Sequence, residues 1–362
     1  MFVSHLSLKD FRSYENLELS LKAGQNIFIG ENGEGKTNII EALMYLALLS
    51  SHRISSDQPL IKLDSERAYI RAKIESDERT TLVELEINNG KANRAKVNQN
   101  PVRSQKEILG LVKSVCFSPE DLDLVRGDPS ERRSFLDQLL IQQSPRLAGV
   151  ISDYERALKQ RNSLLKSRAP ESSLRSWSEH LATFGGELIA GRIKLINEIE
   201  PLFQIAYKNL SAKKLAKLGY KSSIPAPSSE KEVNKEVMLK VIEEVKSQEI
   251  ERGISLVGPH RDDLILNLGD HPVKGYASHG ESWSIALALR LASYQLFINE
   301  GAKPILILDD VFSELDEGRR EKLLEIADSA EQTFITVAVE NDLPKAIQGA
   351  RFKVEMGKVV TL

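Results

Sequence analysis

Residues 30–37 read Gly30-Glu31-Asn32-Gly33-Glu34-Gly35-Lys36-Thr37, between an apolar segment at 25–29 and a segment with helical spacing of apolar residues at 36–49. The stretch fits the pattern G-x-x-x-x-G-K-[ST], and a strand before it with a helix after it is the context that a phosphate-binding loop requires. Glycines let backbone N–H groups wrap phosphates without obstruction by Cβ atoms, and the start of a helix adds partial positive charge. The alternative is a glycine-rich turn before a helix.

The loop therefore predicts a nucleotide site that holds a metal ion. Lys36 would reach the β- and γ-phosphates, and the Thr37 hydroxyl would ligate Mg²⁺. The residues expected to contact the nucleotide here are Gly30, Glu31, Asn32, Gly33, Glu34, Gly35, Lys36, Thr37 and Asn38.

A second acidic element lies at Ile305-Leu306-Ile307-Leu308-Asp309-Asp310. Its apolar residues predict a buried parallel strand, and the two carboxylates follow at the C-terminal edge, where ligands bind in α/β sheets. Asp309 is the candidate ligand for Mg²⁺, directly or through water, and Asp310 is placed to polarise the attacking water. The alternative is a strand that ends in a solvated acidic turn.

The stretch Ser278-His279-Gly280-Glu281-Ser282 lies at a loop-to-helix junction, with Ser278 standing 31 residues before Asp309. Ser278 and Gly280 at a helix N-terminus would form another anion-binding feature. The alternative is a helix cap with Glu281 in the first turn, where a carboxylate suits the helix dipole.

Composition excludes several classes of protein. With 362 residues, 41% hydrophobic and 28% charged, the chain is expected to be globular, with two domains or one domain that carries a large insertion. Its single cysteine, Cys116, excludes a disulfide framework and Cys-rich metal sites. The chain lacks a long apolar run and a secretory signal, so we expect a cytoplasmic protein without membrane association. The net charge of −3 by itself weighs against nucleic-acid binding.

The periodicities divide the chain into three parts. Residues 1–120 contain alternating, strand-like segments around the phosphate loop, and residues 251–362 alternate short strands with helices. Residues 121–250 have helical periods, at 133–142, 148–166, 174–219 and 231–247. This order predicts an α/β domain with a mainly parallel sheet assembled from the two termini, into which a mainly helical lobe is inserted.

These elements, in this order, resemble the ATP-binding-cassette (ABC) P-loop ATPases, and more narrowly the branch that contains the SMC proteins and the RecF family. The resemblance implies ATP and Mg²⁺ as cofactors and an ATP-dependent homodimer, in which Ser278 and Gly280 of one protomer complete the ATP site of the other. Lys36, Asp310 and Ser278 would then carry catalysis. Residues 313–316, Ser-Glu-Leu-Asp, look like the D-loop of these ATPases.

Further segments resemble the RecF family in particular. They are Phe11-Arg12-Ser13-Tyr14, Ser51-His52-Arg53, residues 117–122, 129–137 and 160–165, and Gly258-Pro259-His260-Arg261-Asp262-Asp263. The insertion at 121–250 is too short for the coiled-coil arm of an SMC protein and fits this family. The resemblance implies a weak, DNA-dependent ATPase of replication and recombinational repair. It would act at single-strand gaps and stalled forks with RecO and RecR, help RecA loading and support the SOS response.

The chain departs from the family pattern at the signature, which usually reads S-x-G-Q followed by Gln-Arg. Here Glu281 adds a negative charge near a phosphate site, and the usual basic residue is missing. Residues 336–340 contain no switch histidine of the transporter type, and Thr336 is the expected substitute. Glu120 either fills the position of the loop that couples the two lobes or is a carboxylate at a helix N-terminus.

The DNA surface is predicted in the helical lobe. Residues 121–250 hold 21 Lys and Arg against 18 Asp and Glu, whereas the rest of the chain is acidic. Two basic runs lie at 146–168 and 201–229, and the resemblance favours their contact with DNA phosphates. Such contacts would be independent of base sequence, on single-stranded DNA and at gapped or double-stranded junctions. The candidates are Arg156, Lys159, Arg161, Lys213, Lys214 and Lys217. The alternative for each run is a solvated helix face.

Two other classes of function remain open. A transporter-coupled ATPase shares the cassette but would need surfaces for membrane partners. A nucleotide-gated scaffold that does not hydrolyse ATP would recruit partners, and the altered signature is compatible with it.

Overall fold

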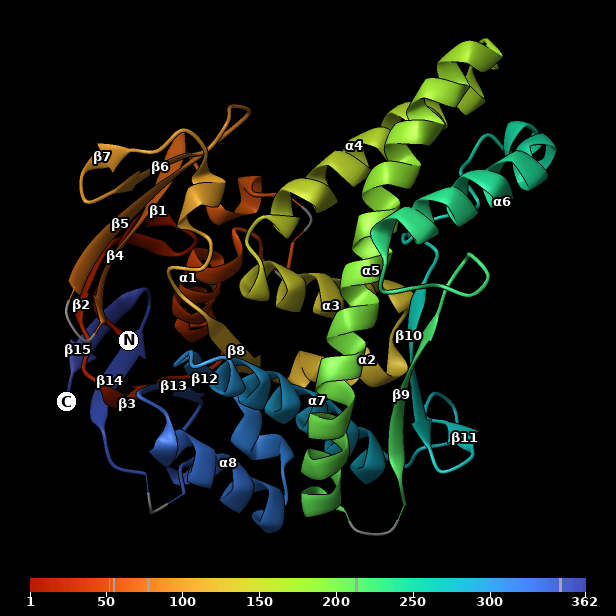
Figure 1. The fold of residues 1–362 in the computed structure, drawn as a ribbon. Coiled ribbons are helices and arrows are strands. Elements are labelled where there is room, and N and C mark those ends of the chain that lie inside the picture. Colours follow the sequence, from red (N-terminus) through yellow and green to blue (C-terminus); the bar gives the residue numbers. More distant parts are fainter. Residues whose placement is uncertain (52, 55, 77–78, 212–213, 345–346) are drawn as a thin grey trace. The chain divides into compact units, whose positions relative to one another are not determined.

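The computed structural model describes residues 1–51, 53–54, 56–76, 79–211, 214–344 and 347–362 (Figure 1). They form two compact units, one of residues 1–121 with 289–362 and the other of residues 122–288. The first unit is an α/β domain assembled from both termini, as predicted. None of the helices in these residues is long and apolar enough to cross a membrane.

A mainly parallel sheet in the first unit has the strand order β15-β14-β3-β13-β12-β8. Its strands are β3 (Gly24–Ile29), β8 (Ser114–Phe117), β12 (Ile305–Asp309), β13 (Gln332–Val337), β14 (Ala350–Glu355) and β15 (Lys358–Thr361). All neighbours pair in parallel except β14 and β15. β8, β12 and β13 are buried along their whole length, which accounts for the apolar run before Asp309 and the burial of Cys116.

A second, antiparallel sheet in the same unit has the order β2-β1-β4-β5-β6-β7. Its strands are β1 (Phe2–Phe11), β2 (Tyr14–Ser20), β4 (Arg67–Ser76), β5 (Arg79–Asn88), β6 (Arg94–Val97) and β7 (Asn100–Pro101). Helix α1 (Lys36–Leu48) lies between the two sheets, and one apolar core joins it to both (Figure 1). Because α1 meets a sheet on two sides, its buried residues surround the helix instead of forming one stripe.

Shorter elements complete the first unit. Helix α8 (Glu317–Ser329) packs near β3. Short 3₁₀ helices lie at Gln58–Leu60, Gln105–Ile108, Pro119–Asp121, Val311–Glu314 and Glu340–Asp342. Helix α7 (His279–Asn299) begins in the second unit and ends in the first.

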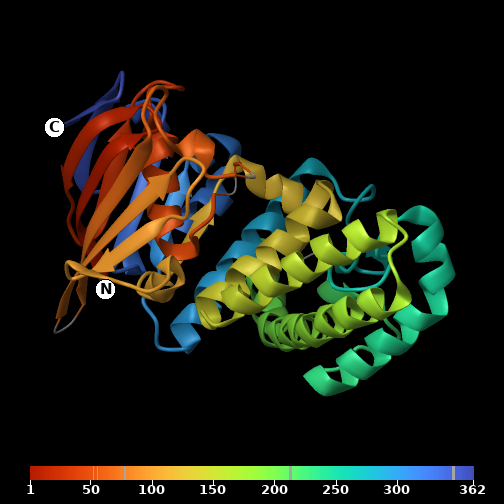
Figure 2. The ribbon, with the colours of Figure 1, turned by 90° about the horizontal axis from the view of Figure 1, so that it is seen from above.

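The second unit is mainly helical, as predicted. Its helices before α7 are α2 (Leu122–Arg126), α3 (Pro129–Gln143), α4 (Leu147–Lys166), α5 (Glu171–Leu210) and α6 (Lys231–Arg252). α4, α5 and α6 pack side by side (Figure 2). A small antiparallel sheet has the order β11-β10-β9, with β9 at Ala216–Lys221, β10 at Asp263–Leu268 and β11 at His271–Pro272.

The helix predicted over 174–219 is too long. α5 ends at Leu210, and β9 follows, because residues 216–221 alternate with a period of two and turn Ala216 and Leu218 inward. β9 pairs with β10, so β10 belongs to the second unit. That unit therefore extends to Ala288, beyond the expected boundary at 250.

The C-terminal hairpin of β14 and β15 was not predicted. Residues 350–355 alternate weakly, and β15 is short and mostly exposed, so neither strand carries a strong apolar signal. β14 nevertheless pairs with β3 next to the phosphate loop.

Ion pairs tie the helices of the second unit to one another and to its sheet. Arg132 on α3 donates to both carboxylate oxygens of Asp263 on β10, at 2.8 and 3.0 Å. Arg192 on α5 donates to both oxygens of Asp137 on α3, at 2.9 and 2.8 Å, and to the carbonyl of Pro259 at 2.7 Å. The segments 129–137 and 258–263, which carry part of the family resemblance, therefore hold this unit together.

Arg161 lies inside the second unit. Its side chain is 2% exposed, and its guanidinium donates to Glu249 at 2.5 Å, to Ser178 at 2.9 Å and to Ser255 at 2.7 Å. Glu249 is itself fully buried, so the two charges compensate each other. The prediction that Arg161 contacts DNA is therefore wrong, because a basic run in the sequence does not show which face of α4 other helices cover.

Arg161→Ala should lower the free energy of unfolding by about 3–5 kcal/mol, because it leaves Glu249 buried without its counter-charge. Arg156→Ala removes an exposed arginine from the same helix and should change the free energy of unfolding by less than about 0.5 kcal/mol. Urea unfolding followed by circular dichroism measures both. If both substitutions lowered the free energy of unfolding equally, the buried ion pair of Arg161 and Glu249 would be contradicted.

Candidate nucleotide site

The phosphate loop connects β3 to α1. Gly30 lies against β14, where an added Cβ would overlap the carbonyl oxygen of Val354. Gly35 has a φ of 112° as the N-cap of α1, and a Cβ there would meet the hydroxyls of Tyr14 and Ser13 at 2.8 and 3.0 Å. Close packing therefore requires glycine at both positions.

The segment Phe11–Tyr14 supports the loop and the start of α1. Tyr14 donates its hydroxyl hydrogen to the carbonyl of Gly35 at 3.1 Å, and Asn38 donates to Ser13 Oγ at 2.9 Å. Arg12 donates to both oxygens of Glu41, a buried residue of α1, at 2.7 and 2.6 Å. These bonds fix α1 against the antiparallel sheet and hold the loop in place.

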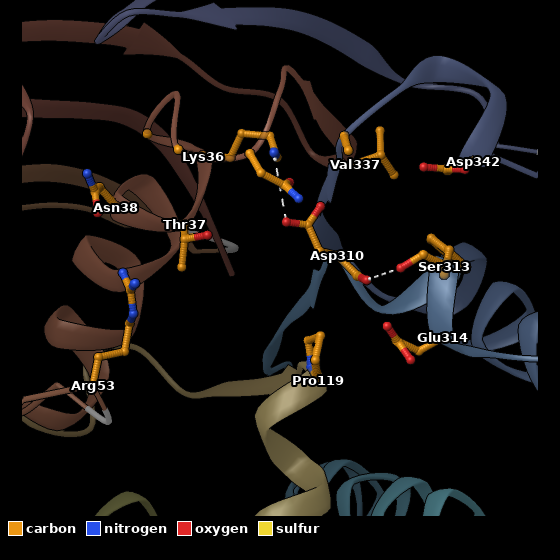
Figure 3. Close-up of a pocket in the computed structure, with 15 residues that line it drawn as sticks. Lys36, Thr37, Asn38, Arg53, Pro119, Asp310, Ser313, Glu314, Val337 and Asp342 are labelled. Atoms are coloured by element: carbon orange, nitrogen blue, oxygen red, sulfur yellow. Dashed lines mark hydrogen bonds and ion pairs between the residues drawn. The ribbon is translucent and has the colours of Figure 1, made fainter. Parts of the chain in front are cut away.

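Lys36 faces the acidic end of β12 (Figure 3). Its Nζ donates to the carbonyls of Gly30 at 2.7 Å and Glu31 at 3.2 Å, and lies 3.8 Å from Oδ2 of Asp310. The side chain is 3% exposed, so its ammonium is held close to the loop. Two motifs that the sequence predicted separately thus meet in one place.

One hydroxyl orders both aspartates. Thr336 Oγ1 donates to Oδ1 of Asp309 at 2.5 Å and accepts the N–H of Asp310 at 2.9 Å. Asp310 has a φ of 49°, a left-handed conformation that costs energy in a residue other than glycine. Thr336 is fully buried, so the expectation that it substitutes for a switch histidine beside the phosphate does not agree with the structure.

Burial is the main influence on the pKa values of Asp309 and Asp310, and it raises both. It raises the pKa of Asp309 to about 6, although the Thr336 hydrogen bond lowers it. It also raises the pKa of Asp310, against the opposing effect of Lys36. A carboxylate with a raised pKa accepts a proton more readily near neutral pH than an ordinary aspartate does. This direction of shift favours a proton acceptor, and the role of Asp310 in polarising water stays a prediction.

Lys36 and Asp310 line one cavity of about 570 Å³, a volume typical of small-molecule sites. The predicted residues on its wall are Asn32, Gly33, Gly35, Lys36, Thr37, Asn38 and Asp310. The remaining wall consists of Arg53, Pro119, Phe312, Ser313, Glu314, Val337, Ala338 and Asp342. Glu120, next to Pro119, is exposed, and its negative charge raises the pKa of both aspartates.

The oxygen donors of this cavity fit Mg²⁺. Thr37 and Asp310 line the cavity, and Asp309, which precedes Asp310 in the chain, is buried. Magnesium that binds with a nucleotide takes one or two protein oxygens and completes its shell with phosphates and water. Among the described residues no three His, Cys, Asp or Glu side chains form a metal-binding group, so the magnesium site rests on the two predicted ligands, Thr37 and Asp309.

Glu34, a predicted nucleotide contact, turns its side chain to the C-terminal hairpin instead. Its carboxylate accepts the N–H of Met356, and its carbonyl oxygen accepts the N–H of Gly357 at 3.3 Å. The Glu34 side chain is thus engaged within the protein, and a contact of its backbone with the nucleotide stays a prediction. The sequence could not indicate it, because the strands on either side of Met356 and Gly357 were not predicted.

The sequence patterns did not indicate a role for Arg53 or Asp342. Arg53 ends a segment noted only for its family resemblance, and its neighbour His52 lies outside the described residues. Asp342 follows β13, and its charge raises the pKa of Asp310. One signal could have indicated Asp342. It follows the C-terminal end of a strand that neighbours β12, and ligands bind at this edge of a parallel sheet.

The signature segment belongs to the second unit and starts α7. The N–H of Ser278 donates to Oε2 of Glu281 at 2.9 Å, and the N–H of Glu281 donates to Ser278 Oγ at 3.3 Å. This reciprocal pair is a capping box, so the helix-cap alternative describes the local geometry. Whether Ser278 and Gly280 also bind an anion stays a prediction.

The basic residues predicted to contact DNA differ in their surroundings. Arg156 and Lys159 on α4 and Lys217 on β9 are exposed, and Arg156 lies 3.4 Å from Asp153. Lys214 forms an ion pair with Glu281 at 2.8 Å. Lys213 lies outside the described residues.

The amino-acid sequence matches the family described as "RecF/RecN/SMC N terminal domain" over residues 2–359. A protein of Streptomyces avermitilis named "DNA replication and repair protein RecF" is 52% identical over 371 residues, covering 99% of each chain. A protein of the same name from Kineococcus radiotolerans is 49% identical over 374 residues, covering 96% of each chain.

Solved structures of RecF and of an SMC protein are also similar to this chain. One described as "Structure of the recombination mediator protein RecF-ATPrS in RecFOR pathway" has a TM-score of 0.91 at 28% identity, covering 100% of this chain and 98% of that chain. An SMC head domain from Pyrococcus furiosus has a TM-score of 0.55 at 17% identity, covers 100% of this chain and 96% of that chain, and shows the fold alone.

The fold and the cavity define a P-loop protein of the RecF/RecN/SMC class, with an architecture like that of ABC ATPases. Within this class the chain belongs to the RecF family. The resemblance drawn from the sequence motifs is confirmed, and the transporter-coupled class is excluded because similarity to RecF extends over the full chain.

Asp309→Asn should raise the free energy of unfolding at pH 7.5, by about 1–3 kcal/mol. The folded state raises the pKa of Asp309 to about 6, so stability from its protonated form is fully present below pH 4 and is lost as the pH rises through 6. The gain from asparagine should therefore be smaller at pH 5 than at pH 7.5. Urea unfolding at both pH values measures it, and a gain independent of pH would contradict the raised pKa.

Thr336→Val should lower the free energy of unfolding by about 1–3 kcal/mol, because the N–H of Asp310 and the carboxylate of Asp309 lose a buried hydrogen-bond partner. It should also raise the pKa of Asp309 further, since the hydroxyl stabilises the charged form. Thr336→Ser keeps the hydroxyl and is the matched control. Unfolding measured against pH tests both effects, and a serine variant as unstable as the valine variant would count against this role.

Proposed function

We propose that this chain is an ATP-dependent DNA-binding protein of replication and recombinational repair that forms a homodimer when it binds ATP. The observation that carries the proposal is the cavity in which Lys36 and Thr37 face Asp310. Solved RecF structures described with ATP and with ATPrS support ATP as the nucleotide.

In the proposed ATP hydrolysis, different residues would bind the phosphates, hold the metal ion and orient the water. The loop at 30–37 and Lys36 would bind the phosphates through N–H groups and positive charge. Thr37 and Asp309 would hold Mg²⁺, which when bound neutralises charge on the β- and γ-phosphates. Asp310, with its raised pKa, would accept a hydrogen bond from the attacking water. Weak hydrolysis is expected, as the resemblance to the RecF family implies.

Dimerisation would bring Ser278 and Gly280 of one copy to the ATP held by the other. The start of a long helix suits a phosphate, since its first N–H groups and dipole favour negative charge. ATP would then join two copies, and each site would be complete only in the dimer.

DNA would contact the exposed cations of the second unit, Arg156, Lys159 and Lys217 among them. Such contacts go to phosphates and do not select a base sequence, so single-stranded DNA and gapped or double-stranded junctions are the proposed ligands. The names of the relatives, which refer to DNA replication and repair and to the RecFOR pathway, support a role with RecO and RecR in recombinational repair. Action at single-strand gaps and stalled forks, with RecA loading and SOS induction as outcomes, is the finer part of the proposal.

The sharpest test is the mass of the particle, measured by light scattering with and without ATP and DNA. The parent chain should dimerise with ATP and retain DNA more tightly, with retention falling steeply as salt increases. Lys36→Arg and Ser278→Arg should each abolish the ATP effect. Lys353→Arg, a conservative change of an exposed lysine on β14, is the control. A Lys36 variant that dimerised and held DNA as the parent does with ATP would refute the proposal.

A scaffold that binds ATP without hydrolysing it remains the second candidate, because Glu281 places a carboxylate within the signature. Single-turnover cleavage of ATP in the presence of DNA separates the two. Hydrolysis that is lost in Asp310→Asn, with slowed release of DNA, supports the ATPase. Unchanged DNA cycling in that variant supports the scaffold.

A further inference from the structure

The signature of this chain carries a charge that opposes its proposed ligand. Glu281 stands where the family pattern has glutamine, and an uncompensated carboxylate at the start of α7 would repel a phosphate. The basic residue that usually follows is replaced by Trp283, which is buried. Local sequence alone therefore describes a weak signature.

The structure supplies a cation from a distant segment. Nζ of Lys214, between α5 and β9, lies 2.8 Å from Oε1 of Glu281. The two residues are 67 positions apart in the chain and belong to the same compact unit. The pairing arises because the chain turns back after α5 to form β9, the strand that the sequence patterns missed.

Each oxygen of the Glu281 carboxylate has its own partner. Oε1 accepts from Lys214, and Oε2 accepts the N–H of Ser278 at 2.9 Å. The lysine and this N–H group hold the pKa of Glu281 at about 2, and the carboxylate raises the pKa of Lys214. The pair is therefore fully ionised at neutral pH, and one carboxylate connects the lysine to the signature serine.

We propose that Lys214 is the charge-compensating residue of the signature: it neutralises and orients Glu281, so that Ser278 can receive a phosphate of the nucleotide held by a second copy of this chain. The inference rests on the proposed function. It also reassigns Lys214, which belongs to the signature and not to the DNA surface. Lys214 is a positioning residue that acts through Glu281.

The stability of the chain does not explain the pair. The Lys214 side chain is 54% exposed, and exposed ion pairs contribute little to folding. A change at Lys214 should thus leave the protein folded, and an altered assembly would report the signature itself. The melting temperature of each variant checks this point.

A double-mutant cycle on dimerisation tests the proposal. Lys214→Ala should weaken the ATP-driven dimer by about tenfold, because the carboxylate then faces the incoming phosphate without compensation. In a Glu281→Gln background, which keeps an acceptor for the N–H of Ser278, Lys214→Ala should change dimerisation less than about twofold. Lys208→Ala, an exposed lysine near the end of α5, is the control and should behave as the parent does.

The readouts are the dimer dissociation constant with ATP, from light scattering, and DNA affinity without ATP. Equal weakening by Lys214→Ala in both backgrounds, or loss of DNA affinity without ATP, would assign Lys214 to direct ligand contact and overturn the inference. Unchanged dimerisation of Lys214→Ala while the parent responds to ATP would also overturn it, without affecting the proposed function. A parent chain that failed to dimerise with ATP would overturn both.

Discussion

Thr336 stands in register with Phe28 of β3 on one side and with Asp309 of β12 on the other, in three neighbouring parallel strands. The rest of the site depends on this pairing. Parallel strands bring their carboxyl ends to one edge, so the loop after β3 and the aspartates after β12 meet although most of the chain separates them. A slip of one residue would turn Thr336 to the opposite face and remove its hydroxyl from Asp309.

The shape of the phosphate loop is fixed by protein contacts. Gly30 is pressed against β14, Gly35 against Tyr14 and Ser13, and Glu34 against the C-terminal hairpin. Lys36 is held by two carbonyls of the same loop. Such support means that little ordering remains to be done when a phosphate group binds, which favours affinity. The C-terminal residues thus belong to the architecture of the nucleotide site.

The second unit shows why charge counted along a chain is a poor guide to a binding surface. Its buried or nearly buried arginines, Arg132, Arg161 and Arg192, are each paired with a carboxylate of the same unit. Burying such pairs costs solvation energy, and the bonds between α3, α4, α5, α6 and β10 offset it. The basic excess that suggested DNA binding is therefore only partly available to solvent. The residues that remain candidates are those that lie on exposed faces.

The sequence by itself determined the α/β class, the helical insertion, the two nucleotide-binding motifs and the family, because these depend on short-range spacing and on residue types that local chemistry requires. Only the tertiary structure decided that Arg161 is buried and that Thr336 orders the aspartates without facing the cavity. It alone placed Glu34 against Met356 and Lys214 against Glu281. In each case the deciding partner is distant in sequence or lies on a neighbouring strand or helix. Which faces pack together is set by the whole fold, and the periodicity of one segment does not encode it.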